Sequence, residues 1–266
     1  MEGRRAPLTR KVVAVTELRD RMVEAHGGEE RWRDVRQVMA CVTMGGMEFT
    51  SRFQSGPLRN VEVTVGTGSP DVAFADFPEP GQTARFQPCR VWVEDGTGNV
   101  IDERAAPGAV FRSIRHWFVW DSLDVVYYCG MSLWQALCLP FTLLRSGCEL
   151  EDLEPLEAED RRLDRLRVVF PADVPSFAPE QVFHADVAGL VHRVDCAPRL
   201  YGSWLRVAQL LNEFETQDGL VYASRRRIVP CLPSGATVPA VPLGWMDLDD
   251  VNFVRGSSLA ARVGPP

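Results

Sequence analysis

Apolar and polar residues alternate with a period of two along most of this chain. Because successive side chains of a strand point to opposite faces of a sheet, this alternation is typical of antiparallel strands with one buried face. Turn-forming residues such as Gly45-Gly46 and Gly56-Pro57 separate the segments. The alternating segments are residues 35–44, 47–56, 58–66, 84–95, 99–104, 162–171, 180–186, 190–196, 203–215, 220–230 and 244–254. The pattern predicts a large, strongly curved antiparallel sheet of about 11 strands, a half-barrel.

Helical periodicity occurs in two places. Near the start of the chain, Leu18, Met22 and Ala25 lie at helical spacing before Gly27-Gly28, which predicts one N-terminal amphipathic helix. The second helical region covers about residues 109–144 and is interrupted by Pro140. The concave face of a curved sheet needs a cover, so we expect this mid-chain insertion to cover it and to enclose an apolar cavity. Residues 1–266 are thus predicted to form a single α+β domain.

The formal net charge of −7 originates in one segment. Residues 149–160, ELEDLEPLEAED, contain seven acidic side chains and no basic one, and the rest of the chain has 29 acidic and 29 basic residues. No basic stripe is available to bind a phosphate backbone, so we expect no nucleic-acid partner.

Other sequence features concern cellular location and cofactors. The apolar run after Lys11 is only about five residues long, too short for a secretory signal, so a cytoplasmic location is expected. The seven cysteines are irregularly spaced and contain no CxxC pair, so we expect free thiols, no bound metal and no cofactor. Lys11 is the only lysine among 29 basic residues, which indicates a GC-rich genome such as that of an actinobacterium.

The stretch WDSLDVVYYCGMSLW, residues 120–134, contains the first candidate site. On a helix, its aromatic face would present Trp120, Asp124, Tyr127, Tyr128, Met131 and Trp134. Aromatic rings with a few polar groups suit the wall of a ligand cavity. In that case Asp124, Tyr127 and Tyr128 would donate or accept protons. Trp120, Met131 and Trp134 would contact the ligand.

Two other interpretations of this stretch are open. Asp121 and Asp124 would occupy the N-cap and N3 positions of the helix, where acids are favoured, and the aromatic rings would then belong to the core. The charge-free run from Val125 to Leu144 is also long enough to span a bilayer. Its polar residues, Pro140 and the β pattern on both sides argue against a span, whereas weak contact with a lipid surface is compatible with it.

Histidines on the predicted strands provide a second candidate. If residues 187–189 form a hairpin loop, His184 and His192 become cross-strand neighbours, and Asp186 shares their face. His184 would then exchange protons near neutral pH, or the group would bind a metal. No third spaced ligand supports the metal, and solvent exposure of both rings is an equal alternative.

Arginines and glutamates near the end of the chain provide a third candidate. Arg225 and Arg227 share one face of the strand at residues 220–230. Facing inward they would bind a carboxylate or phosphate, and facing outward they would form a solvated edge or pair with the acidic segment. Glu213 and Glu215 lie near the end of the preceding strand, and whichever of them faced inward would pair with Asp124. Desolvation would raise the pKa of such a pair enough to protonate an enol ether or a ketone.

In the order of its landmarks the chain resembles a group of actinobacterial cytosolic proteins. The landmarks are AHGGEERW (25–32), WDSLDVVYYCGMSLWQALCLPF (120–141), RLRVVFP (165–171), EQVFHADVAGLVHRVD (180–195) and QDGLVYASRRRIVP (217–230). The fold of that group is similar to the lipoprotein-carrier (LolA-like) half-barrel, in which a curved sheet and covering helices enclose an apolar cavity. The resemblance implies this fold for nearly the whole chain. It does not imply lipoprotein transport, which requires a signal peptide.

Two functions are expected from these features. The first is a cofactor-free cyclase or isomerase, for example one closing a spiroketal-type ring, that acts on a hydrophobic polyketide-like or terpenoid intermediate. Cyclases of polyketide pathways have a similar architecture, and holding a substrate in the right orientation supplies much of the rate of a ring closure. The second is a non-catalytic carrier or sensor that binds a lipid or another hydrophobic small molecule.

Overall fold

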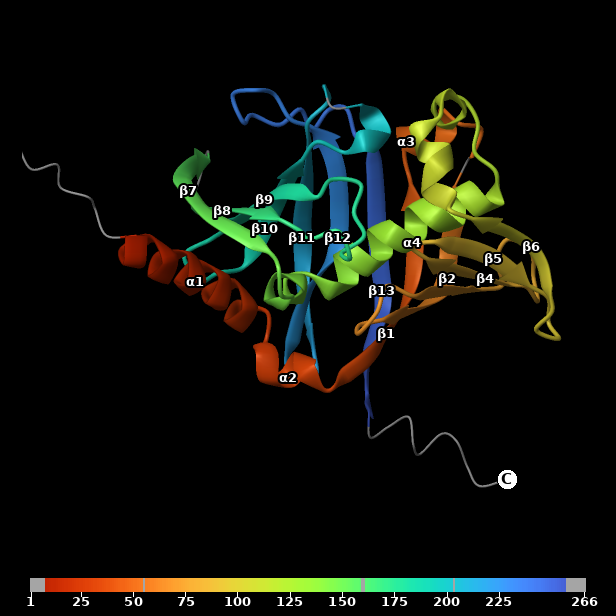
Figure 1. The fold of residues 1–266 in the computed structure, drawn as a ribbon, viewed down its shortest axis with the longest axis horizontal. Coiled ribbons are helices and arrows are strands. Elements are labelled where there is room, and N and C mark those ends of the chain that lie inside the picture. Colours follow the sequence, from red (N-terminus) through yellow and green to blue (C-terminus); the bar gives the residue numbers. More distant parts are fainter. Residues whose placement is uncertain (1–7, 55, 159–160, 203, 257–266) are drawn as a thin grey trace, which may run out of the picture.

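One antiparallel sheet dominates the computed structural model, which describes residues 8–54, 56–158, 161–202 and 204–256 (Figure 1). Its strands are β1 (Val35–Gly45), β2 (Leu58–Gly66), β3 (Val72–Ala75), β4 (Thr83–Gln87), β5 (Arg90–Glu94), β6 (Val100–Ala105), β7 (Glu149–Ala158), β8 (Arg161–Val169), β9 (Glu180–Ala185), β10 (Val191–Cys196), β11 (Val207–Gln217), β12 (Leu220–Pro230) and β13 (Gly244–Arg255). The α-helices are α1 (Leu8–Ala25), α2 (Glu29–Arg33), α3 (Met47–Thr50) and α4 (Ser122–Cys138). Short 3-10 helices are η1 (Pro107–Arg112), η2 (Ile114–Trp117), η3 (Phe141–Leu144) and η4 (Arg199–Tyr201).

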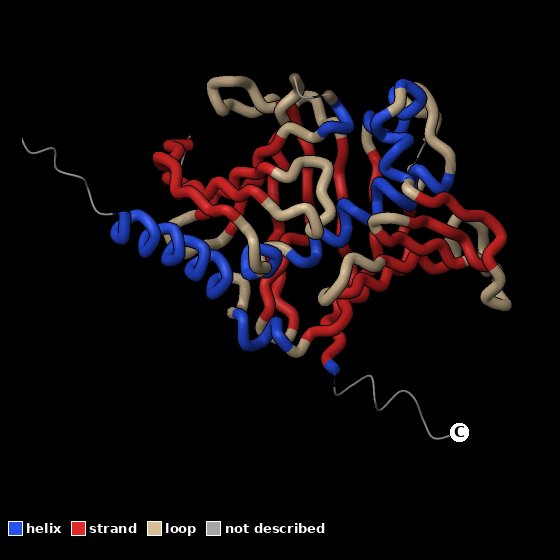
Figure 2. The backbone as a smooth tube through the Cα atoms, in the orientation of Figure 1, coloured by secondary structure: helices blue, strands red, loops and turns tan. Residues whose placement is uncertain are grey.

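The strand order explains why a helix crosses the sheet. The order is β6-β5-β4-β3-β2-β1-β13-β12-β11-β10-β9-β8-β7, so two meanders join at the central pair β1–β13. β6 and β7 follow each other in the chain but lie at opposite edges of the sheet. The intervening segment, residues 106–148, must therefore cross the whole sheet. Figure 2 shows the strands as one curved layer in red, with α4 in front of it.

The alternation of residue types along the strands places the main core between the sheet and α4. On β1, for example, Val38, Ala40, Val42 and Met44 are all buried on the face that α4 covers. Ala208, Val229 and Cys231 form a small, separate buried cluster on the opposite face. Because burying one large aliphatic side chain contributes roughly 2 kcal/mol, the covered face supplies most of the hydrophobic stabilisation.

Two close contacts hold the crossing segment. Gly130 of α4 lies directly on β4, where a Cβ atom would be only 2.3 Å from Cγ of Phe86. Near the other end, Phe141 of η3 stacks on Trp32 of α2, with ring centroids 4.3 Å apart. The absence of a side chain at residue 130 is thus what allows α4 to approach the sheet so closely.

The structure confirms the α+β class, the large antiparallel sheet, the N-terminal helix and the helical insertion. The sheet remains open and is not closed into a barrel. Among the helices of the described ranges, none combines the length and apolarity that a bilayer crossing requires.

Two predicted strands are wrong, and two strands, β3 and β7, lie in segments that were not predicted as strands. Residues 47–56, predicted as a strand, begin with the short helix α3. Residues 84–95 form two strands, β4 and β5, because a turn at residues 88–89 divides them. The acidic segment contains the edge strand β7, whose Glu151 lies 3.3 Å from Arg167 of β8; the same arginine also lies 2.9 Å from Glu180 of β9. Residues 159–160 of that segment lie outside the described residues.

Candidate functional site

A cavity of about 70 Å³ lies between α4 and the C-terminal half of the sheet. Its walls come from α4, from β1 and β9–β13, and from the loops that precede β9 and β11. Most of the lining side chains are apolar. The polar ones are Tyr128, Ser132, Gln135, Ser176, Gln181, Tyr201, Gln209 and Arg226. This volume is less than half of the roughly 150 Å³ of an apolar cavity that holds benzene, so a long-chain ligand enters only if part of this wall moves.

The part of α4 that faces the cavity is a stripe that shares one residue, Tyr128, with the predicted aromatic face. It consists of Tyr128, Ser132, Gln135 and Ala136, which follow helical spacing. Tyr128 is the one residue of the predicted aromatic face that reaches the cavity. Its ring stacks on Phe177 of the loop before β9, with centroids 5.4 Å apart.

The other members of the predicted aromatic face lie in the packed core and do not line the cavity. The indole of Trp120 donates to the His116 carbonyl at 2.9 Å, and that of Trp134 donates to a carbonyl of β2 at 3.0 Å. Tyr127 packs among phenylalanine rings with centroid distances of 5.1 to 5.9 Å. Met131 is buried in the same cluster.

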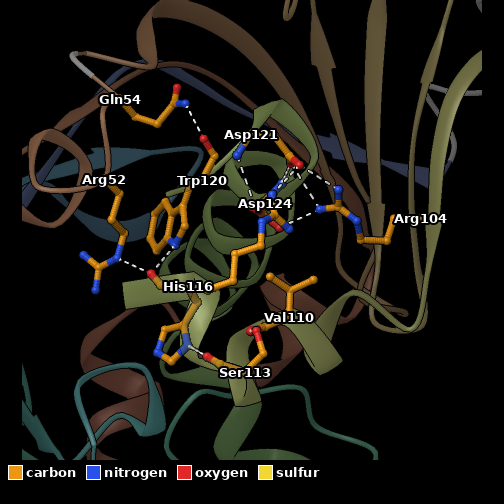
Figure 3. A network of polar contacts seen from close by, with 10 residues as sticks. Arg52, Gln54, Arg104, Val110, Ser113, His116, Trp120, Asp121 and Asp124 are labelled. Atoms are coloured by element: carbon orange, nitrogen blue, oxygen red, sulfur yellow. Dashed lines mark hydrogen bonds and ion pairs between the residues drawn. The ribbon is translucent and has the colours of Figure 1, made fainter. Parts of the chain in front are cut away.

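Asp124 belongs to an ion-pair network at the N-terminus of α4 (Figure 3). Asp121 is the N-cap, and the two aspartates form a capping box: the Asp124 N–H donates to Asp121 at 3.0 Å, and the Asp121 N–H donates to Asp124 at 3.2 Å. Arg104 of β6 lies 2.5 Å from Asp124 and 2.7 Å from Asp121, and Arg115 of η2 lies 2.9 Å from Asp124. This network ties the helix to the edge of the sheet.

The same network determines the charge of the two aspartates. Burial raises the pKa of Asp124. Burial also tends to raise the pKa of Asp121, but the hydrogen bonds to this side chain, foremost that from Arg104, keep its pKa below the ordinary value. Both oxygens of Asp124 contact arginines, so this side chain is engaged in holding the helix and does not face the cavity.

Glu213, Arg225 and Arg227 lie on the face of the sheet away from the cavity. The side chain of Glu213 is 68% exposed and lies 3.6 Å from Arg225, so the predicted pairing of Glu213 with Asp124 is wrong. Arg227 lies 2.6 Å from Asp247. The structure therefore shows the outward alternative for the two arginines, and neither contacts the cavity.

His184 and His192 are not neighbours, although the predicted hairpin β9–β10 is present. A bulge in β10 shifts the register and places His184 opposite Arg193. His184 lies 3.1 Å from Asp195 on the face away from the cavity, and His192 lies 3.0 Å from Asp186. Burial lowers the pKa of His184, and Asp195 opposes this. Within the part of the chain that the structure describes, no group of three or more potential ligands is placed to hold a metal ion.

Glu48 of α3 is a buried acid behind the cavity wall that the sequence pattern did not indicate. It is only 3% exposed, and its Oε2 accepts hydrogen bonds from the hydroxyls of Tyr128, at 2.6 Å, and Tyr201. Its Oε1 has no hydrogen-bond partner among the described residues. Burial raises the pKa of Glu48 to about 7. The one signal in the sequence is an acid between two apolar residues, Met47 and Phe49.

Arg226 of β12 is the charged side chain in the cavity lining. It is 5% exposed and donates through one terminal nitrogen to the carbonyl of Ala136 at 2.6 Å. That carbonyl is available because its partner along the helix would be the N–H of residue 140, and Pro140 has none. The Nε of Arg226 has no hydrogen-bond partner among the described residues. Burial lowers the pKa of Arg226 to about 10.

The sequence matches no model of a known protein family and no curated protein. The structure is similar to that of a DUF1329 family protein from Desulfovibrio piger, with a TM-score of 0.52 and 11% identity over 91% of this chain and 94% of that one. It is also similar to a LolA superfamily protein from Nitrosomonas europaea, with a TM-score of 0.51 and 11% identity over 90% of this chain and 93% of that one. At this identity the similarity shows the fold alone. The resemblance to the lipoprotein-carrier architecture is confirmed: the chain has a LolA-like fold, with a large open antiparallel sheet.

Proposed function

We propose that this chain is a single-domain cytoplasmic carrier or sensor that binds a hydrophobic small molecule between α4 and the concave face of the sheet. The observation that carries the proposal is the cavity, because it combines mainly apolar walls with a few inward-facing polar groups. Sites for small hydrophobic ligands have this composition. The LolA-like fold agrees with it, since the sheet and its crossing helix leave the cavity between them.

The alternative, a cyclase or isomerase, has less support from the positions of the residues. Of the side chains predicted to be catalytic, Tyr128 lines the cavity, but its hydroxyl already donates to Glu48. Asp124, His184 and Glu213 have their own ionic partners away from the cavity. Binding without catalysis requires none of these groups.

Ligand entry requires the cavity to widen beyond its 70 Å³. The inner half of its wall is the sheet, whose strands are fixed by continuous ladders of backbone hydrogen bonds. The outer half consists of α4 and the loop at residues 171–179. Because α4 is held by its ion pairs with Arg104 and Arg115 and by the contact of Gly130 with β4, we assign the opening movement to this loop.

A fluorescence titration with the neutral apolar probe N-phenyl-1-naphthylamine tests this proposal. The variant Ser132→Trp places an indole in the cavity and should weaken probe binding at least about tenfold by occluding it. Ser122→Trp is the matched control, because Ser122 also lies on α4 but not in the cavity lining. Thermal unfolding would establish that both variants are folded. Absence of probe binding by the wild-type protein, or equal binding by the Ser132→Trp variant, would overturn the proposal.

Weak contact with a lipid surface forms part of the same proposal. Three neighbouring loops carry exposed apolar side chains. These are Phe53 on the first loop, Ile114, Phe118 and Val119 on the second, and Trp204 on the third. A hydrogen bond from the Trp120 N–H to the Arg52 carbonyl connects the first two loops, and the His116 ring contacts the Leu200 carbonyl of the third. The third loop also carries η4, which lines the cavity. Co-sedimentation with neutral phosphatidylcholine vesicles should therefore decrease in the double variant Phe118→Ser, Trp204→Ser. Equal co-sedimentation of variant and wild type would argue against this contact.

A further inference from the structure

The positive charge of Arg226 is buried without an acidic partner among the described residues. No Asp or Glu of the described ranges lines the cavity, and no ion pair of Arg226 is present within them. Burial of an unpaired charge is costly, so buried arginines are normally paired with a carboxylate. Asp249 and Asp247 of the neighbouring strand β13 pair instead with Arg225 and Arg227 on the opposite face.

The contacts that Arg226 does make compensate only part of this cost. A guanidinium group has five N–H donors, and one of its nitrogens is hydrogen-bonded here, to the Ala136 carbonyl. Its position near the C-terminus of α4 is favourable, but the helix dipole amounts to only about half an elementary charge. The Nε donor, next to the wall of the cavity, has no partner among the described residues. Arg226 therefore keeps a positive charge without an acidic partner and an Nε–H donor without an acceptor among the described residues.

We propose that the ligand of this cavity carries a carboxylate that binds to Arg226, so that the protein binds a long-chain carboxylic acid. This inference rests on the proposed function and identifies the chemical class of its ligand. The Nε–H and a neighbouring terminal N–H of a guanidinium form a fork that matches the two oxygens of a carboxylate. Met44, Leu139 and Ile228 provide apolar surface for the chain of the ligand.

A carboxylate fits the charge of the cavity better than a phosphate does. The described lining contains one cation, Arg226, which neutralises one negative charge. A phosphate monoester carries between 1.5 and 2 negative charges near neutral pH, by the usual estimate of roughly 6 for its second pKa, and would leave an excess in an apolar site. The hydroxyls of Tyr128 and Tyr201 do not donate hydrogen bonds to the anion, because both already donate to Glu48. The side-chain amides of Gln135 and Gln209 remain as neutral polar groups in the wall.

The experiment compares a fluorescent fatty acid, 11-(dansylamino)undecanoic acid, with its methyl ester. The two probes share a chain and fluorophore and differ in the charge of the head group. The wild-type protein should bind the acid at least about tenfold more tightly, the lower end of what a charge-assisted hydrogen bond contributes. Arg226→Met should lose this preference while its affinity for the ester stays within about twofold, because the apolar walls are unchanged.

Arg225→Met is the matched control, since Arg225 lies next to Arg226 in β12 but faces away from the cavity. It should retain the wild-type preference for the acid. If the Arg226→Met variant does not fold, the comparison of acid with ester in the wild-type protein still tests whether the site prefers a carboxylate. Equal affinity of the wild type for both probes would overturn the carboxylate inference and leave the proposed function standing. Failure of the wild type to bind either probe would overturn the proposed function itself.

Discussion

The buried carboxyl of Glu48 should make the protein less stable as the pH rises. Its pKa is raised from 4.5 to about 7 because burial disfavours the carboxylate, and the hydrogen bonds from Tyr128 and Tyr201 offset this only in part. Between these two pKa values the folded protein holds a proton that the unfolded chain releases. The stability conferred by this proton is therefore fully present below about pH 4.5, and it is lost as the pH rises through 7.

The size of the effect follows from the two pKa values. A rise from 4.5 to about 7 corresponds to roughly 3 kcal/mol of unfolding free energy, of which roughly 2 kcal/mol is lost between pH 5 and pH 8. Glu48→Gln keeps the shape of the side chain and an oxygen that accepts from the tyrosines, but its amide does not ionise. The unfolding free energy of the variant, measured relative to that of the wild type, should therefore rise by roughly 2 kcal/mol between pH 5 and pH 8.

Urea denaturation at pH 5, 6, 7 and 8, followed by tryptophan fluorescence, measures this difference. Other groups such as His26, whose pKa burial lowers to about 4, titrate in both proteins and cancel in the comparison. Glu62→Gln, at an exposed position of β2, controls for the change of one formal charge. If the curves of wild type and Glu48→Gln stayed parallel from pH 5 to pH 8, the protonated buried acid would be ruled out.

Three further substitutions test the packing around the site. Gly130→Ala should lower the unfolding free energy by roughly 1–3 kcal/mol, because overlap with Phe86 outweighs the ~1 kcal/mol gained in helix propensity; stabilisation in urea denaturation would contradict the close contact. Asp124→Ala should lower it by about 1–3 kcal/mol through loss of the capping box and of an arginine partner, with unchanged binding of N-phenyl-1-naphthylamine. Weaker probe binding at unchanged stability would instead place Asp124 in the ligand site. Gly244→Ala, whose Cβ would lie 2.2 Å from Oε1 of Glu48, should destabilise by roughly 1–3 kcal/mol at pH 5, and an unchanged urea midpoint would show that the acid has room to move.

The strands were predictable because each has one face buried, which imposes the alternation of residue types. The exceptions have physical causes that lie outside the segments themselves. Residues 47–50 contain the apolar spacing of a strand and of a helical turn alike, and only the packing of Glu48 against two distant tyrosines distinguishes them. The acidic strand β7 was not predictable from its own residues, since Glu151 and Glu157 lie opposite Arg167 and Arg162, which come later in the chain, on β8.

The polar residues of the site were predictable by type more than by position. The sequence offered Arg225 and Arg227 as inward or outward alternatives and did not single out Arg226, because a shift of one residue exchanges the two faces of a strand. The alternation around Arg226, with Ser224 and Ile228 on its side, follows from the pairing of β12 with β11 and β13. A bulge in β10 likewise separated His184 from His192. Bulges and register depend on partner strands, and a single alternating segment contains no information about them.

The position of the cavity follows from the way α4 is attached to the sheet. Its N-terminus is tied to β6 by Arg104, and its middle lies against β4 through Gly130, so the helix packs mainly on β2–β5. On the other side, β10–β13 share the cavity with the stripe that begins at Tyr128 and with the loop before β9. Ser132 and Ala136 in that stripe are too small to fill the space. The aromatic side of α4 thus fixes the helix in place, and its small, polar side leaves open the cavity that Arg226 lines.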